Sequence, residues 1–279
     1  MDKIKIYVAC HKPGEVYQDS VYTPIHVGRA ISKYKKEMAG MIGDNTGENI
    51  SEKNASFCEL TAQYWAWKNI DNTEYIGFCH YRRGFEIRFS ENNIEQIFGD
   101  GTDVVLAGPV LRDKGRFECL KTYVGSEDLA IMLWVVKSLY PGYYDTVSDY
   151  ANGIIDYPFN MLVCKKSLFN EYAKWIFNIL FECEKYIQPA PYSRARRVYG
   201  YLSEFLMPAF FIHKQCKIKA MRYTTDRDPV RGGISKSSLI KLKLMDWIYW
   251  RGKKKPRLGI DNAIRLGLAA DGIIEIGDF

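Results

Sequence analysis

A short apolar run that ends in two arginines is the segment of this chain best suited to chemistry. Residues 75–79 (YIGFC) are typical of a buried strand, and residues 80–83 (HYRR) follow directly. In open α/β sheets, ligands bind at the carboxyl ends of strands. A guanidinium can bind phosphate through two parallel N–H···O bonds, so Arg82 and Arg83 suit a ligand that carries phosphates. The alternative is a pair of surface arginines that merely follow a strand.

Strands and helices alternate along the chain, which predicts an α/β fold around a mainly parallel sheet. No GxGxxG follows the first strand and no GxxxxGK[ST] is present, so neither a dinucleotide-type Rossmann site nor a P-loop is expected. The apolar patterns predict strands at 3–10, 75–79, 103–107, 161–164 and 217–222, and helices at 54–69, 94–98, 126–139, 169–187 and 198–211.

Composition limits the class of protein. The 279 residues suffice for one large α/β domain, or for one domain with a small extension. The apolar runs are far too short to span a bilayer and no signal-peptide core follows Met1, so we expect a cytosolic protein. Seven cysteines are scattered singly without a CxxC pair, which predicts free thiols rather than a zinc ribbon or a redox motif.

Positive charge is concentrated in the C-terminal part of the chain. Residues 214–257 hold 14 Lys or Arg against three Asp, a net charge of +11 in a chain whose total is +6. This asymmetry predicts an anionic partner: membrane lipid, nucleic acid or a pyrophosphate. Within residues 237–255, tryptophans and a tyrosine are mixed with lysines, which suits the interface of an anionic bilayer. A helix packed on the domain with a basic, solvated end is the alternative.

Four blocks of sequence together resemble a family of bacterial capsular and exopolysaccharide glycosyltransferases that was long filed as a domain of unknown function. They cover roughly residues 4–211, and the second and third are long and specific. The tail beyond about 223 matches no motif, so we expect a catalytic domain at 1–223 and a basic, aromatic extension at 224–279. The blocks are 6–12 (IYVACHK, with PIHVG at 24–28 downstream), 43–69 (GDNTGENISEKNASFCELTAQYWAWKN), 74–85 (EYIGFCHYRRGF) and 159–177 (FNMLVCKKSLFNEYAKWIF, followed by GYLSEFL at 200–206).

The resemblance implies a GT-A-like fold, that is, a Rossmann-type α/β domain that binds a nucleotide sugar. It implies transfer of a hexose, with galactose or galactofuranose the leading candidate, from a UDP-sugar to an undecaprenyl-diphosphate-linked glycan. Such an enzyme of capsule, exopolysaccharide or O-antigen synthesis would lie peripherally on the inner, anionic face of the plasma membrane and bind no nucleic acid. One rival is a non-catalytic nucleic-acid-binding protein that uses the basic C-terminal segment. A second rival is a phosphate-ester hydrolase that uses His80 and the arginines.

The sequence departs from the GT-A pattern at the metal-binding motif. In that pattern Asp-x-Asp usually follows a central strand and holds a divalent metal on the diphosphate, whereas His80-Tyr81-Arg82 stand at the corresponding edge here. Fixed Arg, Lys and His donors can stabilise the charge that develops on the leaving oxygen, as a metal can. We therefore expect that no metal cofactor is required, with Mg²⁺ or Mn²⁺ bound through Asp44 and the phosphates as the alternative.

The matched blocks also indicate which residues form the site. If the reaction inverts the anomeric centre, a carboxylate must deprotonate the acceptor hydroxyl, and Asp156 and Glu204 are the candidates. Either could instead be structural, and a retaining reaction needs no such base, so both stereochemical outcomes stay open. His80 is expected to be catalytic as well, and Asn160 and Trp67 to contact the acceptor. The expected donor-binding residues are His11, Lys12, Asp44, Asn49, Thr61, His80, Arg82 and Arg83.

Overall fold

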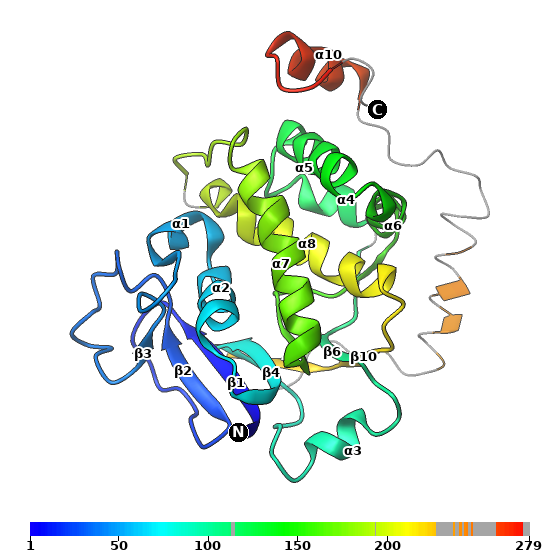
Figure 1. Ribbon diagram of the computed structural model, residues 1–279. Coiled ribbons are helices and arrows are strands. Elements are labelled where there is room, and N and C mark those ends of the chain that lie inside the picture. The colour runs from blue at the N-terminus through cyan, green and yellow to red at the C-terminus, as the bar shows by residue number, and fades with distance from the viewer. Residues whose placement is uncertain are drawn as a thin grey trace. The chain divides into compact units, whose positions relative to one another are not determined.

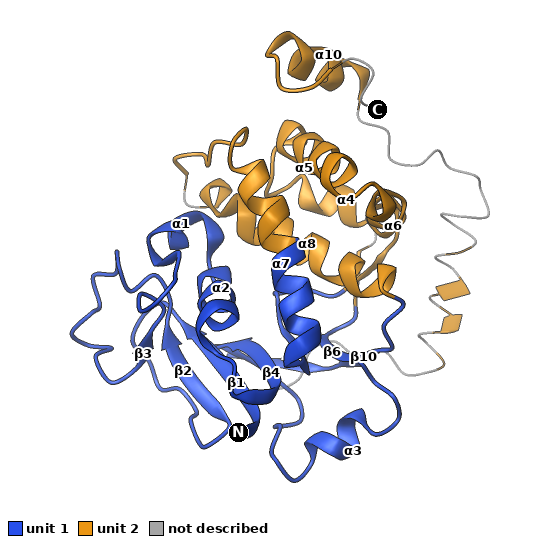
Figure 2. Ribbon diagram, in the orientation of Figure 1, with its two compact units in different colours: residues 1–109, 157–175, 215–233 blue, residues 110–156, 176–214, 234–279 orange. Residues whose placement is uncertain are grey.

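The structure of the chain is a computed structural model (Figure 1). It divides into two compact units, with unit 1 formed by residues 1–109, 157–175 and 215–233 and unit 2 by residues 110–156, 176–214 and 234–279 (Figure 2). The boundary expected at residue 223 stays a prediction, because much of segment 224–279 lies outside the described residues. The structure describes residues 1–112, 115–192, 194–226, 237, 240, 241, 243, 244, 247 and 261–275.

A mixed, mostly parallel sheet forms the centre of unit 1. β1 (Asp2–Cys10) lies between β4 (Thr73–His80) and β2 (Tyr22–His26), and both neighbours run parallel to it. β3 (Ile42–Gly43) extends this side of the sheet beyond β2. On the other side of β4 follow β9 (Leu162–Lys165), β6 (Val104–Ala107) and β10 (Ile218–Met221). Only β9 on this path is antiparallel to its neighbours. The predicted α/β class with a mainly parallel sheet is confirmed.

Two short strands continue from the end of β4. β5 (Arg83–Phe85) turns back from β4, and β11 (Tyr223–Thr225) pairs with β5 in antiparallel register. This pairing joins segments about 140 residues apart in the sequence, since Thr224 lies opposite Gly84. It places the residues after β10 beside the two arginines that follow β4.

The sheet is densely packed where β4 meets β9. Gly77 in β4 has no room for a side chain: a Cβ atom there would lie 2.8 Å from Val163 Cγ2 and 3.1 Å from Ile6 Cγ1. The backbones of β1, β4 and β9 can approach each other because this position is a glycine. The side chains of Ile6 and Val163 are fully buried. This packing fixes the end of β4 that carries the HYRR sequence.

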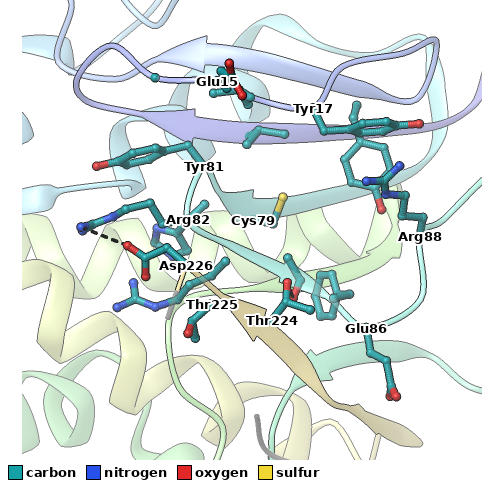
Figure 3. Close-up of a pocket in the computed structure, with 18 residues that line it drawn as sticks. Glu15, Tyr17, Cys79, Tyr81, Arg82, Glu86, Arg88, Thr224, Thr225 and Asp226 are labelled. Atoms are coloured by element: carbon teal, nitrogen blue, oxygen red, sulfur yellow. Dashed lines mark hydrogen bonds and ion pairs between the residues drawn. The ribbon is translucent and has the colours of Figure 1, made fainter. Parts of the chain in front are cut away.

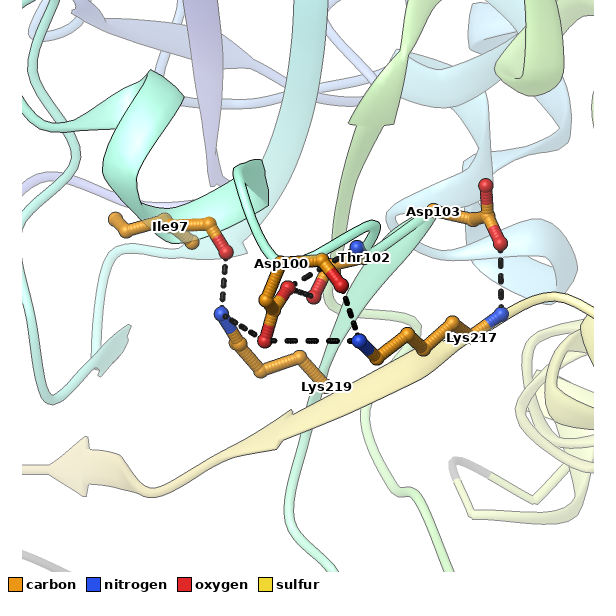
Figure 4. Close-up of polar contacts among 6 residues, drawn as sticks. All are labelled: Ile97, Asp100, Thr102, Asp103, Lys217 and Lys219. Atoms are coloured by element: carbon orange, nitrogen blue, oxygen red, sulfur yellow. Dashed lines mark hydrogen bonds and ion pairs between the residues drawn. The ribbon is translucent and has the colours of Figure 1, made fainter.

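Lys219 in β10 and Lys217 directly before the strand tie the edge of the sheet to the turn before β6 (Figure 4). Lys219 Nζ lies 3.3 Å from Asp100 Oδ2 and also donates to the carbonyl of Ile97, at the end of α3 (Ile94–Phe98). The Lys217 backbone N–H donates to Asp103 Oδ2 at 2.7 Å. Charged side chains on an edge strand also disfavour pairing with another chain. β10 is thereby held in a defined register before the chain continues into β11.

The helix predicted at 54–69 is interrupted in the structure. η1 (Ser51–Lys53), α1 (Asn54–Phe57) and α2 (Leu60–Asn69) follow one another, with Cys58 at φ 53° between α1 and α2. Asn54 Nδ2 donates to the Cys58 carbonyl at 2.7 Å and to Thr61 Oγ1 at 3.1 Å. An asparagine side chain can compete in this way with backbone hydrogen bonds, and here it stabilises the break.

Unit 2 is mainly helical. Its helices within the described ranges include α4 (Arg116–Leu120), α5 (Ser126–Leu139), α6 (Pro141–Asn152), η2 (Ala195–Arg197), α8 (Val198–His213) and α10 (Asn262–Ala270), together with the C-terminal part of α7 (Lys166–Cys183). α5 buries Leu129, Met132 and Val136, whereas Leu139 at its C-terminal end is exposed. A two-stranded sheet of β7 (Val110–Leu111) and β8 (Ile155–Asp156) completes the unit.

Two further predictions concern the chain as a whole. All seven cysteines are free thiols, as expected from their spacing. Across the described ranges, no helix combines the length and the apolar character that crossing a bilayer requires.

Candidate functional site

A pocket of about 640 Å³ opens in unit 1 near the carboxyl ends of β1 and β4 (Figure 3). Three segments supply most of its wall: the loop after β1, the end of β4 with β5, and the end of β11. The position agrees with the general rule that ligands of α/β sheets bind beyond the carboxyl ends of the strands. The wall is formed by Val8, Gly14, Glu15, Val16, Tyr17, Tyr22, Cys79, His80, Tyr81, Arg82, Arg83, Gly84, Phe85, Glu86, Arg88, Thr224, Thr225 and Asp226.

Arg82 carries a positive charge that is only weakly balanced. Its Nη1 lies 3.9 Å from Asp226 Oδ2, and the two side chains are 44% and 50% exposed. Ion pairs of this length and exposure contribute little free energy, so a bound anion can replace Asp226. The guanidinium also lies 5.1 Å from the centre of the Tyr81 ring, and Figure 3 shows both side chains extending to the same side.

Two further guanidiniums of the pocket rest on aromatic rings. Arg83 lies 4.3 Å from the centre of the Phe159 ring, and Arg88 lies 3.7 Å from that of Tyr17. Cation–π contacts of this kind hold a guanidinium in place without neutralising its charge. The carboxylates of the wall are Glu15, Glu86 and Asp226, and Glu86 is already bound to Arg222 through both of its oxygens.

His80 connects the end of β4 to a strained turn before β9. Its Nε2 lies 2.8 Å from the carbonyl oxygen of Phe159, and since a carbonyl only accepts, this nitrogen donates. Phe159 and Asn160 both have left-handed backbones, with φ of 79° and 51°. Gln63 Nε2 donates to the Asn160 carbonyl at 3.0 Å, and Asn160 Nδ2 donates to Glu59 Oε1 at 2.8 Å. Such conformations persist only where the surroundings fix them, and they cluster at functional sites.

Asp44, which was expected to contact the donor, is buried and accepts several hydrogen bonds from neighbouring loops. Its carboxylate accepts the backbone N–H groups of Gly28 at 2.7 Å and Arg29 at 3.1 Å, and the Ser51 hydroxyl at 2.5 Å. Gly28 has φ +65°, and a Cβ atom there would lie 2.6 Å from the Asn54 side chain. The fully buried carboxylate thus orders the loops after β2 and β3. The structure shows a structural role for Asp44; its contact with a donor or a metal stays a prediction.

The remaining expected donor contacts lie at different depths. His11 and Lys12 are exposed after β1, and the His11 ring meets the Tyr81 ring edge to face at 5.4 Å. Asn49 is engaged in its own turn, donating to the Gly47 carbonyl at 2.9 Å. Thr61 is fully buried and donates to the Cys58 carbonyl at 3.1 Å. Of the eight expected donor residues, His80, Arg82 and Arg83 line the pocket.

The two residues expected at the acceptor side also differ in accessibility. Asn160 is 1% exposed, and its amide is used within unit 1, as described above. Trp67 is partly exposed on α2, with Lys68 Nζ 4.2 Å from its ring centre. Because Asn160 is buried, its amide hydrogen-bonds within the protein. Neither acceptor contact is tested by these positions.

Both candidate bases lie in unit 2, around Arg112. Arg112 Nε donates to Asp156 Oδ2 at 2.8 Å, and the Tyr150 hydroxyl donates to Asp156 Oδ1 at 3.3 Å. Burial lowers the pKa of Arg112, but Asp156 and, more weakly, Glu204 raise it, and the net change is upward. The Asp156 carboxylate is therefore engaged by the Arg112 guanidinium. Catalysis by either carboxylate stays a prediction.

A divalent metal ion would need ligands beyond those that the described residues bring together. Among the described residues, no three His, Cys, Asp or Glu side chains gather at one point. At the end of β4 the side chains are cationic or aromatic, and the Asp44 oxygens already accept three hydrogen bonds. Hard divalent cations need several oxygen ligands. Metal independence stays a prediction.

The pocket also contains residues that sequence reasoning missed. Tyr17, Arg88 and the segment 224–226 belong to its wall. Arg88 offered a signal, since it is a third arginine shortly after the same strand. The segment 224–226 offered none, because only the pairing of β11 with β5 brings it to the pocket.

Comparison with known proteins places this fold among glycosyltransferases. The solved apo structure of WbbM, a bifunctional glycosyltransferase, superposes with a TM-score of 0.71 at 29% sequence identity. The match covers 84% of this chain and 47% of WbbM, so the chain spans about half the length of that protein. No curated protein matches the chain closely. The family model described as Domain of unknown function (DUF4422) matches residues 5–215, and the chain belongs to this family.

Proposed function

We propose that the protein is a glycosyltransferase that moves a hexose from a UDP-sugar to a lipid-diphosphate-linked oligosaccharide. The observation that carries the proposal is the pocket at the end of β4, where Arg82 and Arg83 face an open volume in a fold similar to WbbM. Galactose, as pyranose or furanose, is the proposed hexose on the basis of the family resemblance. An undecaprenyl-diphosphate-linked glycan is the proposed acceptor on the same basis.

In the proposed reaction the arginines stabilise the leaving group. Cleavage of the bond between the sugar and the diphosphate places negative charge on the departing oxygen, and preorganised cationic donors stabilise that charge as it develops. Arg83 is suited to this role because the Phe159 ring fixes its guanidinium 4.3 Å away. Arg82 is suited because its ion pair with Asp226 is 3.9 Å long and partly exposed, and therefore competes weakly for it. His80 acts as a positioning residue through the Phe159 carbonyl.

The proposal includes an interaction with an anionic membrane. A lipid-linked acceptor is presented at a bilayer surface, and the net charge of +11 in residues 214–257 would draw the protein to anionic lipid. Ile240, Leu244 and Trp247 are exposed and lie four and three residues apart, which is typical of one face of a helix. Lys253, Lys254 and Lys255, the densest cluster of charge, lie outside the described residues.

A donor screen tests the proposed function. Thermal unfolding of the purified chain is measured with UDP-, GDP- and dTDP-sugars and with a nucleic-acid oligomer, because a ligand of the native state raises the melting temperature by mass action. UDP-sugars alone should stabilise the protein, and release of UDP should then be measured with the best donor. Stabilisation by the oligomer but by no nucleotide sugar would refute the proposal and favour a nucleic-acid-binding protein.

A further inference from the structure

The hydroxyl of Tyr81 is a buried polar group without a hydrogen-bonding partner among the described residues. Tyr81 lies in the wall of the pocket, directly after β4. Two other tyrosines of the wall use their hydroxyls within the protein: Tyr17 donates to Asp19 Oδ2 at 2.8 Å, and Tyr22 accepts from the Phe89 N–H at 3.0 Å. A buried hydroxyl without a partner destabilises the protein unless something else supplies one. We therefore expect a bound ligand to supply the partner of Tyr81.

The surroundings of Tyr81 indicate the chemistry of this partner. The Arg82 guanidinium lies 5.1 Å from the centre of the phenol ring, and the His11 ring contacts it edge to face at 5.4 Å. A guanidinium offers only hydrogen-bond donors. A ligand group that binds beside both Arg82 and the hydroxyl of Tyr81 should therefore be a negatively charged acceptor. Burial raises the pKa of Tyr81, although Arg82 opposes this, so the phenol keeps its proton at neutral pH and can donate.

The direction of the side chains agrees with this reading. Figure 3 shows the Tyr81 hydroxyl and the Arg82 guanidinium extending to the same side of the end of β4. A phosphate group has several acceptor oxygens, so one oxygen can accept from Tyr81 while another binds Arg82. Asp226, which now faces Arg82 at 3.9 Å, would be displaced from the guanidinium by such a ligand.

We infer that the Tyr81 hydroxyl donates a hydrogen bond to a phosphate oxygen of the bound nucleotide, beside Arg82. The inference rests on the proposed function, because it deepens the same pocket and names a contact within it. It also explains why a phenol rather than a phenylalanine ring stands between His80 and Arg82.

The test compares the full-length wild type with Tyr81→Phe, using UDP and uridine as probes in calorimetric titrations and thermal unfolding without ligand as the second readout. Loss of one hydrogen bond to a charged group should weaken UDP binding by about 10-fold or more. Uridine has no phosphate, so its affinity should not change. The melting temperature of free Tyr81→Phe should equal or exceed that of the wild type, because an unsatisfied buried group is removed.

Tyr199→Phe is the matched control. The hydroxyl of Tyr199 is buried, lies outside the pocket wall and donates to the Ile187 carbonyl at 2.7 Å. Its removal leaves that carbonyl without its partner, so this variant should melt at a lower temperature and bind UDP as the wild type does. The two Tyr→Phe changes should thus have opposite effects on stability and on binding.

Several results would overturn the inference. Equal UDP affinity of the wild type and Tyr81→Phe would exclude the contact, while leaving the proposed function intact. An equal loss for UDP and uridine would assign the hydroxyl to the nucleoside and not to a phosphate. A clearly lower melting temperature for free Tyr81→Phe would show that the hydroxyl already has a structural partner. If the wild type bound neither UDP nor any nucleotide sugar, the proposed function would fall as well.

Discussion

Replacement of Arg82 or Arg83 by alanine gives the most direct test of the leaving-group role. Both side chains line the pocket, and both guanidiniums lie within about 5 Å of an aromatic ring centre that fixes them. Removing one preorganised donor to a developing negative charge typically slows a reaction by about 10²–10³-fold. We expect a loss of at least about 10²-fold in turnover for one of the two variants, equivalent to roughly 2.7 kcal/mol of transition-state stabilisation.

The same contacts predict that both variants fold. Arg82 is 44% exposed and makes one long ion pair with Asp226, so its truncation should change stability by less than about 1 kcal/mol. Arg83 loses its contact with the Phe159 ring, a change of about 0.5–2 kcal/mol. A global domain stability of roughly 5–15 kcal/mol tolerates either loss. A fall in activity can therefore be separated from unfolding.

The assay is the initial rate of UDP release at saturating donor, with thermal unfolding of each variant measured in parallel. Arg83→Lys keeps the charge but not the two-pronged geometry, so its rate should lie between those of the wild type and Arg83→Ala. Arg196→Ala is the control, because Arg196 is an exposed arginine in unit 2 that donates to the Pro191 carbonyl. Wild-type turnover in both folded alanine variants would refute the role proposed for the arginines.

Four further predictions concern the stabilising role of Asp44, the titration of His26, the need for a metal ion and binding to anionic membranes. Asp44→Asn should lower the free energy of unfolding by about 2–5 kcal/mol in urea, because two N–H groups and the Ser51 hydroxyl lose a charged acceptor; a loss of UDP binding without a loss of stability would instead show a direct donor contact. Burial lowers the pKa of His26, and Arg29 adds to this effect while Asp44 opposes it. The unfolded state therefore binds more protons below about pH 6.5, and stability should fall from pH 7 to pH 5 by at most about 1.4 kcal/mol per pH unit for this proton. His26→Phe should reduce that slope, leaving the share of His213, whose pKa is also lowered by burial; an unchanged slope would show that His26 does not contribute. Excess EDTA should leave substantial transferase activity, whereas complete loss restored by Mn²⁺ would reveal a metal site that the described carboxylates do not show. Charge reversal of Lys253, Lys254 and Lys255 should reduce sedimentation with anionic liposomes at low salt, since each basic residue at the surface contributes about 1 kcal/mol; undiminished binding would exclude this cluster from the membrane contact.

The parts of the fold that the sequence predicts are those with a strong local pattern. β1 alternates apolar and polar residues at its start, β4 and β6 are apolar runs, and α5 and α7 have apolar residues at helical spacing. Their types therefore follow from the local sequence pattern. β2 was missed because Pro24 interrupts it and lacks the N–H that a central strand normally uses. α6 was missed because its sequence, PGYYDTVSDYAN, offers few aliphatic side chains.

The candidate site was predictable only where it depends on one strand. The position of Arg82 and Arg83 at a strand end followed from the apolar run before them. The partner of His80 lies 79 residues away, and the strand that brings Asp226 to Arg82 lies about 140 residues from it. Such pairings arise from the tertiary fold and leave no local pattern. Asp44 was expected to contact the donor, and no local pattern indicated that its carboxylate is fully buried.

The contacts around the strand end form a chain of support for one positive charge. His80 donates to the Phe159 carbonyl, and the left-handed turn at Phe159 and Asn160 is fixed further by Gln63 and Glu59. The Phe159 ring, held in this way, carries the Arg83 guanidinium. A metal ion places a positive charge, at a position set by its ligands, where it can stabilise a transition state. In this protein the Phe159 ring and the strained turn fix the position of the Arg83 guanidinium. On the proposed role of Arg83, the strained backbone at Phe159 and Asn160 is part of the free-energy cost of fixing this charge before the substrate binds. The hydrogen bonds of His80 and of the buried Asn160 amide stabilise that strained turn.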